Sequence, residues 1–463
     1  MSDSSSGQPL FIRRVLVEKL FGRYTYDLRL QDTTDTSRLM VLYGDNGSGK
    51  TTILFLIYYL LTSIQGRGYK GYIAKTPFRR IHIEVGGDIT VAAQRDGDQL
   101  IGEFRASVTR HGQTIASLLF KADKDNDITP KALGYEDEFL AFMNAVKQLN
   151  ISLFYVTDDR ELLSNFVPVP DEDEQLLLEM DEAGEVVRKR RRAPGLRSSK
   201  IDTALQRAIR LATDAIRQRV IKGAKQGEAD VTTIYSSIVK RLASSSRPAQ
   251  TLNIQSLIST LQQQAQRSAE FAQFGLPSPR NIEDLIDVLR RARNRLPVVL
   301  KVMQPYVDGI NARLDALQEV QQSIFSFVGT IDSFYRDKKV EFDLEHGLTV
   351  TTSGQTLNPA DLSSGEKQLL LLFCNALAAR NEATIVLIDE PEISLNIKWQ
   401  RQLIPSLLET SKERALQFIL ATHSFELFAP YESNVVQLND AKTLAQRGTS
   451  SSNTSRTGRH LQA

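Results

Sequence analysis

A glycine-rich segment near the start of the chain, residues 44–51 (Gly-Asp-Asn-Gly-Ser-Gly-Lys-Thr), constrains the fold more than any other feature. Residues 39–43 before it form an apolar run typical of a buried strand, and residues 51–64 after it read as a helix. A strand, a glycine turn and a helix in this order indicate an α/β fold, in which ligands bind at the carboxyl edge of a parallel sheet. The glycines allow a tight turn, so that successive backbone N–H groups point at one centre, as phosphate binding requires.

The residue types in this loop fit the phosphates of ATP. Lys50 is expected to reach the β- and γ-phosphates, and Thr51 to coordinate Mg²⁺. The start of the following helix adds a dipole that favours anions. The sequence therefore predicts ATP and Mg²⁺ as cofactors, with ATP contacts from Gly44, Asn46, Gly47, Ser48, Gly49, Lys50, Thr51 and Thr52.

A second buried strand, residues 384–388, ends in two acidic residues. Asp389 is expected at the carboxyl edge of the sheet, where it would bind Mg²⁺ together with Thr51. Glu390 would orient and deprotonate the attacking water, which is the positioning that phosphoryl transfer needs. We therefore predict Glu390 and Lys50 as catalytic residues.

Residues 362–366 (Leu-Ser-Ser-Gly-Glu) lie more than 300 residues after Lys50 and precede an apolar helix start. Ser363 and Glu366 have the spacing of a capping box, and a capped helix start is also an anion site. In this order, after the phosphate loop and before Asp389-Glu390, the segment resembles the signature motif of ABC-type ATPases. Ser364 stands where that family has its first glycine.

The resemblance implies how further residues act. In ABC-type ATPases the signature serine and second glycine, here Ser363 and Gly365, contact the γ-phosphate held by the opposite subunit. Two copies would then pair head-to-tail on ATP, with a dimer as the minimal unit and larger homo-oligomers left open. His423 matches the family's switch histidine and would be the third catalytic residue; Ser394 matches the D-loop serine, while Asn396 departs from the usual histidine.

The position of the family's glutamine loop stays open at this point. Gln94 and residues 157–160 (Thr-Asp-Asp-Arg) both follow predicted strands. Arg160 has a plain salt bridge as its alternative role.

The spacing of the motifs predicts a divided ATPase head. Residues 1–165 are expected to form an N-terminal lobe with the phosphate loop, and residues 340–440 a C-terminal lobe with the other motifs. Residues 166–339 between them are rich in Gln, Arg and Ala with helical periodicity, which predicts a helical, short coiled-coil-like insert. Residues 441–463 are a low-complexity tail predicted to be disordered.

A long insert is typical of the SMC, RecF and OLD-like branch of these ATPases rather than of transporters. The motifs are similar to those of stand-alone ATPases of bacterial anti-phage systems such as Septu and PARIS. That resemblance implies a sensor or regulatory subunit of a defence complex, in which a separate nuclease is the effector. The alternatives are a RecF- or SMC-like ATPase of DNA repair or chromosome maintenance, and a scaffold that binds ATP without turnover, against which the intact Glu390 argues.

Composition limits the partners and the compartment. The net charge is +2, so a nucleic-acid surface would have to be local. Such a surface is the basic run 188–192, which could contact DNA or a DNA-mimicking protein, or only neutralise the adjacent acidic residues 171–174. The single cysteine, Cys374, lies in an apolar run and is expected to be buried and inert. The absence of a signal peptide and of a long apolar span predicts a cytoplasmic protein with no membrane partner.

Overall fold

Two units make up the chain in a computed structural model. Contacts group Met1–Ala204 with Ala379–Ala463 in the first unit and Leu205–Ala378 in the second. The described residues are 10–30, 38–64, 68–86, 88–130, 134–164, 176–180, 186–190, 200–243, 254–278, 282–291, 296–382, 384–411 and 416–438. The predicted tail 441–463 lies outside them.

A six-stranded, mostly parallel sheet forms the centre of the first unit. Its order is β17-β3-β16-β15-β8-β9, and only β9 runs antiparallel to its neighbour. The strands are β3 (Leu39–Tyr43), β8 (Leu153–Val156), β9 (Leu162–Ser164), β15 (Ile385–Asp389), β16 (Gln417–Thr422) and β17 (Val435–Gln437). Their continuous apolar runs are what a sheet covered on both faces requires, and β15 and β16 are buried throughout.

The pairing register brings the carboxyl ends of four strands to one edge. Ala421 of β16 pairs with Leu42 of β3 on one side and with Asp389 of β15 on the other. Ile388 of β15 pairs in turn with Val156, the last residue of β8. The loops that follow β3, β16, β15 and β8 therefore start side by side, although they are up to several hundred residues apart in the sequence.

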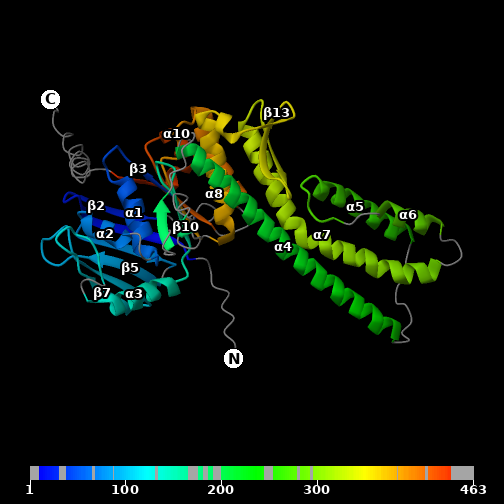
Figure 1. The fold of residues 1–463 in the computed structure, drawn as a ribbon, viewed down its shortest axis with the longest axis horizontal. Coiled ribbons are helices and arrows are strands. Elements are labelled where there is room, and N and C mark those ends of the chain that lie inside the picture. Colours follow the sequence, from blue (N-terminus) through cyan, green and yellow to red (C-terminus); the bar gives the residue numbers. More distant parts are fainter. Residues whose placement is uncertain are drawn as a thin grey trace, which may run out of the picture. The chain divides into compact units, whose positions relative to one another are not determined.

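An antiparallel sheet of order β2-β1-β4-β5-β6-β7 completes the first unit (Figure 1). Its inward residues alternate with outward ones, as in a sheet with one buried face. The strands are β1 (Ile12–Leu20), β2 (Tyr24–Arg29), β4 (Arg80–Val85), β5 (Ile89–Gln94), β6 (Phe104–Arg110) and β7 (Gln113–Phe120), with α2 (Tyr69–Lys75) and α3 (Glu136–Gln148) packed nearby.

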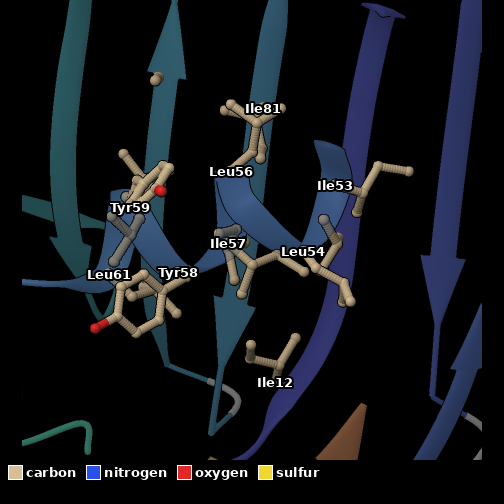
Figure 2. Close-up of a cluster of buried hydrophobic side chains, with 14 of the residues drawn as sticks. Ile12, Ile53, Leu54, Leu56, Ile57, Tyr58, Tyr59, Leu61 and Ile81 are labelled. Atoms are coloured by element: carbon tan, nitrogen blue, oxygen red, sulfur yellow. The ribbon is translucent and has the colours of Figure 1, made fainter. Parts of the chain in front are cut away.

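The helix after the phosphate loop, α1 (Lys50–Leu61), contacts strands of both sheets. Figure 2 shows its side chains gathered with Ile12 of β1 and Ile81 of β4. Gln417 of β16 makes a second link, because its buried amide accepts a hydrogen bond from the Ile12 N–H and donates one to the Ile12 carbonyl, each 2.8 Å long. The phosphate loop is thus carried by a helix that is fixed on both sides.

The second unit contains the predicted helical insert. It comprises α4 (Lys200–Ala243), which starts in the first unit, α5 (Ile254–Ala272), α6 (Ile282–Arg291) and α7 (Leu296–Phe334), and Figure 1 shows α5 and α6 beside α7. Helices α4 and α7 approach closely where α4 has two glycines one turn apart: a Cβ on Gly223 would lie 2.7 Å from the Ala316 carbonyl oxygen, and one on Gly227 would lie 3.1 Å from Arg313 Cα. The coiled-coil-like pairing therefore depends on small residues.

The same unit also holds a three-stranded sheet and the start of α8 (Ser364–Glu382). Its strands are β12 (Lys339–Asp343), β13 (Gly347–Thr352) and β14 (Gln355–Leu357), and β12 and β13 form the predicted hairpin. The structure thus groups residues 340–378 in one unit with the helices of the insert. The division of the chain into an N-terminal lobe (1–165), an insert (166–339) and a C-terminal lobe (340–440) stays a prediction.

A hairpin of β10 (Leu176–Met180) and β11 (Val186–Arg190) was not expected from the sequence. It places part of the basic run 188–192 on a strand, while residues 191 and 192 lie outside the described residues. Within the described part of the chain, no helix has the length and apolar character needed to cross a membrane. Cys374 is buried, as expected, and burial raises the pKa of its thiol well above the usual range.

Candidate nucleotide site

The phosphate loop connects β3 to α1 at the carboxyl edge of the parallel sheet. Gly47 (φ 82°) and Gly49 (φ 92°) adopt left-handed backbone conformations, which glycine reaches without strain. A Cβ on Gly49 would also lie 2.7 Å from Leu20 Cδ2. Gly44 is equally enclosed, since a Cβ there would lie 2.9 Å from Ser48 Oγ. The predicted glycines are therefore required by the shape of this loop.

Lys50 is buried at the first position of α1. Its Nζ donates hydrogen bonds to the carbonyl oxygens of Gly44 (2.8 Å) and Asp45 (3.2 Å) and lies 3.8 Å from Glu390 Oε1. The ammonium group is thus directed into the loop that precedes it, where phosphate oxygens are expected. Asn46 is exposed on the same loop, and the side chain of Thr52 faces Tyr72 of α2.

Asp389 ends β15 with a side chain that is almost completely buried. Neither carboxylate oxygen has a hydrogen bond of normal geometry among the described residues. Burial raises the pKa of Asp389 to about 7, the nearby Thr51 hydroxyl partly offsets that rise, and the charges of Asp158 and Glu390 add to it. A buried carboxylate next to the Thr51 hydroxyl offers the hard oxygen ligands that Mg²⁺ prefers, so the residues present fit this ion.

Glu390 and His423 face each other across the loops after β15 and β16. Nδ1 of His423 contacts Glu390 Oε2 and lies 3.3 Å from Glu392 Oε1. Because both neighbours are carboxyl oxygens, we assign the ring hydrogen to Nδ1. Glu390 has φ 48°, an uncommon conformation for a residue with a side chain, and such strain concentrates at functional sites. The structure thus brings together Lys50, Glu390 and His423, the three predicted catalytic residues.

Glu392 is a member of this cluster that the sequence analysis missed. Its carboxyl is 4% exposed, and Oε1 accepts hydrogen bonds from Thr422 Oγ1, from the His423 N–H (2.9 Å) and from the Ser424 N–H (3.2 Å). Burial raises the pKa of Glu392, and the donors partly offset this rise. The available sequence signal was its place at the end of the run Asp389-Glu390-Pro391-Glu392, two positions after Glu390.

The two candidates for the glutamine loop lie in different places. Gln94 ends β5 of the antiparallel sheet and is exposed. Residues 157–160 follow β8, next to β15 at the nucleotide edge, and the charge of Asp158 acts on Asp389. Arg160 Nη2 donates a 3.3 Å hydrogen bond to Ser394 Oγ, and both residues have left-handed φ angles of 70° and 68°. Position therefore favours residues 157–160.

The signature-like segment lies in the second unit at the start of α8. Ser363 and Glu366 form the expected capping box: the Ser363 N–H and hydroxyl each donate to Glu366 Oε2 at 2.8 Å. The side chain of Glu366 also accepts a 2.8 Å hydrogen bond from Lys338, and its carbonyl accepts one of 2.9 Å from the Tyr335 hydroxyl. Ser363 is exposed and Gly365 is buried.

Comparison with known proteins adds the family to this geometry. Residues 39–429, from β3 to the end of α10 (Phe425–Phe428), match the model of a family described as "AAA domain, putative AbiEii toxin, Type IV TA system". The chain belongs to this AAA-domain family. The match contains the phosphate loop, the signature-like segment, Asp389-Glu390 and His423.

Curated relatives of this AAA-domain protein include two ATPases of retrons. The Retron Ec83 probable ATPase of Escherichia coli is 28% identical over 186 residues, which cover 37% of this chain and 32% of the relative. The Retron Vc95 probable ATPase of Vibrio cholerae is 34% identical over 117 residues, covering 23% and 21%. The matches thus span about a third or less of these relatives. Family and relatives together identify the chain as an ATPase of this AAA-domain family.

Among solved structures, the Smc head domain of Pyrococcus furiosus with an extended coiled coil, bound to the C-terminal domain of ScpA, is similar to this chain. The identity is 12% and the TM-score 0.38, and the alignment covers 96% of this chain and 99% of the other.

Proposed function

We propose that this AAA-domain ATPase hydrolyses ATP at the edge formed by the loops after β3, β16, β15 and β8. The phosphate-loop N–H groups and Lys50 would bind the β- and γ-phosphates, and Thr51 and Asp389 would hold Mg²⁺. Bound Mg²⁺ would neutralise charge on the phosphates. Glu390 would accept the proton of the attacking water, and His423, in contact with Glu390, would contact the γ-phosphate through Nε2.

The second part of the proposal is that the site is completed by another copy of the chain. Ser363 is exposed at a capped helix start, and such a start attracts anions. Ser363 and Gly365 of one copy would contact the γ-phosphate bound by the other. The homodimer is then the smallest active assembly, and ATP is part of its interface.

The third part concerns biological role. We propose that the ATPase is the sensor or regulatory subunit of an anti-phage defence complex and controls a separate nuclease. The observation that carries this part is the similarity to two retron ATPases, which are 28% and 34% identical over the matched residues. The family description, which names a toxin and a toxin–antitoxin system, supports the same assignment.

Phage infection of the native host tests the role directly. The chromosomal gene would be replaced by wild type, Lys50→Ala, Glu390→Gln or the exposed-site control Gln94→Ala, and plaque formation by a phage panel would be counted. We expect Lys50→Ala and Glu390→Gln to lose protection against at least one phage that wild type and Gln94→Ala restrict. Equal plaque counts for all four strains, together with sensitivity of Lys50→Ala to DNA damage, would replace the defence role with DNA repair.

A complementary experiment addresses the effector. Glu390→Gln is expected to keep ATP bound, so the tagged variant should retain its partner during purification with Mg²⁺ and ATP. We expect a stoichiometric protein with DNA- or RNA-cleaving activity that is toxic when expressed without the ATPase. Recovery of DNA alone would contradict control of a separate nuclease.

A further inference from the structure

One buried carboxyl holds three consecutive residues of the loop that carries His423. Oε1 of Glu392 receives hydrogen bonds from the Thr422 hydroxyl and from the backbone N–H groups of His423 and Ser424. The Thr422 hydroxyl itself accepts a 2.9 Å hydrogen bond from the Ser424 N–H, which closes the turn. The orientation of His423 against Glu390 is therefore set by an oxygen atom that belongs to the loop after β15.

We propose that Glu392 is a positioning residue for ATP hydrolysis. It fixes the loop after β16 so that the His423 imidazole stays in contact with Glu390 while Nε2 faces the γ-phosphate. The inference rests on the proposed role of His423. The loop after β15 would then have two functions. It would carry Glu390, which accepts the proton, and through Glu392 it would also position His423, which contacts Glu390.

The surroundings of Glu392 argue against a purely stabilising carboxyl. A buried carboxyl is costly to desolvate, and Oε2 has no hydrogen-bond partner among the described residues. A group selected only for stability would have both oxygens satisfied or would be apolar. Three hydrogen bonds join Oε1 instead to the loop with His423, and Oε1 also lies 3.3 Å from the His423 ring nitrogen.

The Ser424 end of the loop after β16 is also held by contacts that do not involve Glu392. Loss of His423 positioning can therefore be distinguished from loss of the whole loop. The Ser424 hydroxyl donates a 2.7 Å hydrogen bond to Gln400 of α9 (Ile397–Thr410), and Gln400 donates to the Leu395 carbonyl at 2.9 Å. Loss of the Glu392 bonds therefore frees the His423 end of the loop while its Ser424 end stays attached. The phosphate loop lies on β3 and α1 and does not depend on Glu392, so ATP binding should survive.

Two conservative variants show whether the position or the charge of the Glu392 side chain matters, through which of them hydrolyses ATP faster. The amide oxygen of Glu392→Gln can accept the same three hydrogen bonds at the same reach, so kcat should stay within about threefold of wild type. Glu392→Asp keeps the charge but is one methylene shorter, so the loop would shift and kcat should fall about tenfold or more. If kcat of Glu392→Asp exceeds that of Glu392→Gln, the proposal is overturned, because the charge of the side chain and not its position would then matter.

A double-mutant cycle separates a positioning role from a general structural one. Single-turnover ATP hydrolysis and binding of a fluorescent ATP analogue would be measured for Glu392→Ala, His423→Ala, the double variant and the matched acidic control Glu426→Gln. We expect Glu392→Ala to slow hydrolysis about 10- to 100-fold with analogue affinity unchanged, and the double variant to be no slower than His423→Ala. Glu426, which pairs with Arg401 on the surface, should be neutral.

The outcomes also separate this inference from the proposed site. If His423→Ala turns over ATP at the wild-type rate, the proposed role of His423 fails. If His423→Ala is slow while Glu392→Ala is not, only the positioning role fails. Rate losses that multiply in the double variant, or a parallel loss of analogue affinity, would show that Glu392 acts on the fold. Should Glu392→Ala not fold, the Gln and Asp variants carry the test.

Discussion

Replacing Gln417 by alanine should destabilise the first unit strongly. Gln417 is 0% exposed, and its amide joins β16 to β1 through two hydrogen bonds of 2.8 Å to the backbone of Ile12, which is also 0% exposed. Alanine would leave the Ile12 N–H and carbonyl both unpaired. A buried polar group without its partner costs about 1–3 kcal/mol, so two such groups should lower the free energy of unfolding by about 4 kcal/mol.

Urea unfolding followed by circular dichroism measures this loss, with attention to the transition of the first unit because a chain of two units need not unfold in one step. Gln417→Met keeps most of the side-chain volume but neither hydrogen bond, and should lose nearly as much stability as Gln417→Ala. The exposed Gln94→Ala should change stability by less than about 0.5 kcal/mol. A loss below about 1 kcal/mol in both Gln417 variants would refute the reasoning, because the Ile12 groups would then have other partners.

Three further predictions concern the nucleotide site. Glu390→Gln should bind ATP, fail to turn over and elute as a dimer in size-exclusion chromatography with light scattering, and a monomer at saturating ATP would contradict pairing. Ser363→Arg and Lys50→Ala should each be inactive alone, but a 1:1 mixture should recover about a quarter of wild-type ATPase activity, since half of the dimers are mixed and each has one intact composite site. No recovery would reject the composite site. In EDTA, Asp389→Asn should raise the free energy of unfolding. The pKa of Asp389 is about 7 in the folded protein and 3.8 without the influence of the fold, so the wild-type protein loses stability as the pH rises from 4 to 7. The variant should therefore gain up to about 4 kcal/mol over wild type at pH 8 and almost nothing at pH 4, and a pH-independent difference would be incompatible with a buried carboxyl of raised pKa.

The strands that lead into the motifs were predictable, because each is a continuous apolar run that ends at its motif. A parallel sheet places the carboxyl ends of its strands at one edge, so Lys50, Asp389 and His423 could be expected together without any knowledge of strand order. The pairing register of β3, β16 and β15 in the structure shows that the ends of these three strands lie side by side. The capping box of Ser363 was equally readable, because the spacing of a cap is local.

Other features depend on contacts that local patterns do not encode. Glu392 could not be recognised because its donors come from a loop 30 residues later in the chain, and a buried acid looks like a surface acid in a sequence. The ambiguity between Gln94 and residues 157–160 persisted because both follow strands, and only the topology shows which strand lies beside β15. The β10–β11 hairpin was missed because each strand has only five residues, LLLEM and VVRKR, and neither shows the alternation of apolar and polar residues that marks a half-buried strand.

The attachment of the signature-like segment to α7 has a mechanical consequence. This helix has 39 residues, a length of about 58 Å at 1.5 Å per residue, and it leads directly into Tyr335. The Tyr335 hydroxyl and the Lys338 ammonium both bind Glu366, the residue that caps Ser363. A movement of the C-terminal end of α7 would therefore be transmitted through Glu366 to Ser363, and a shift of Ser363 would in turn act on α7.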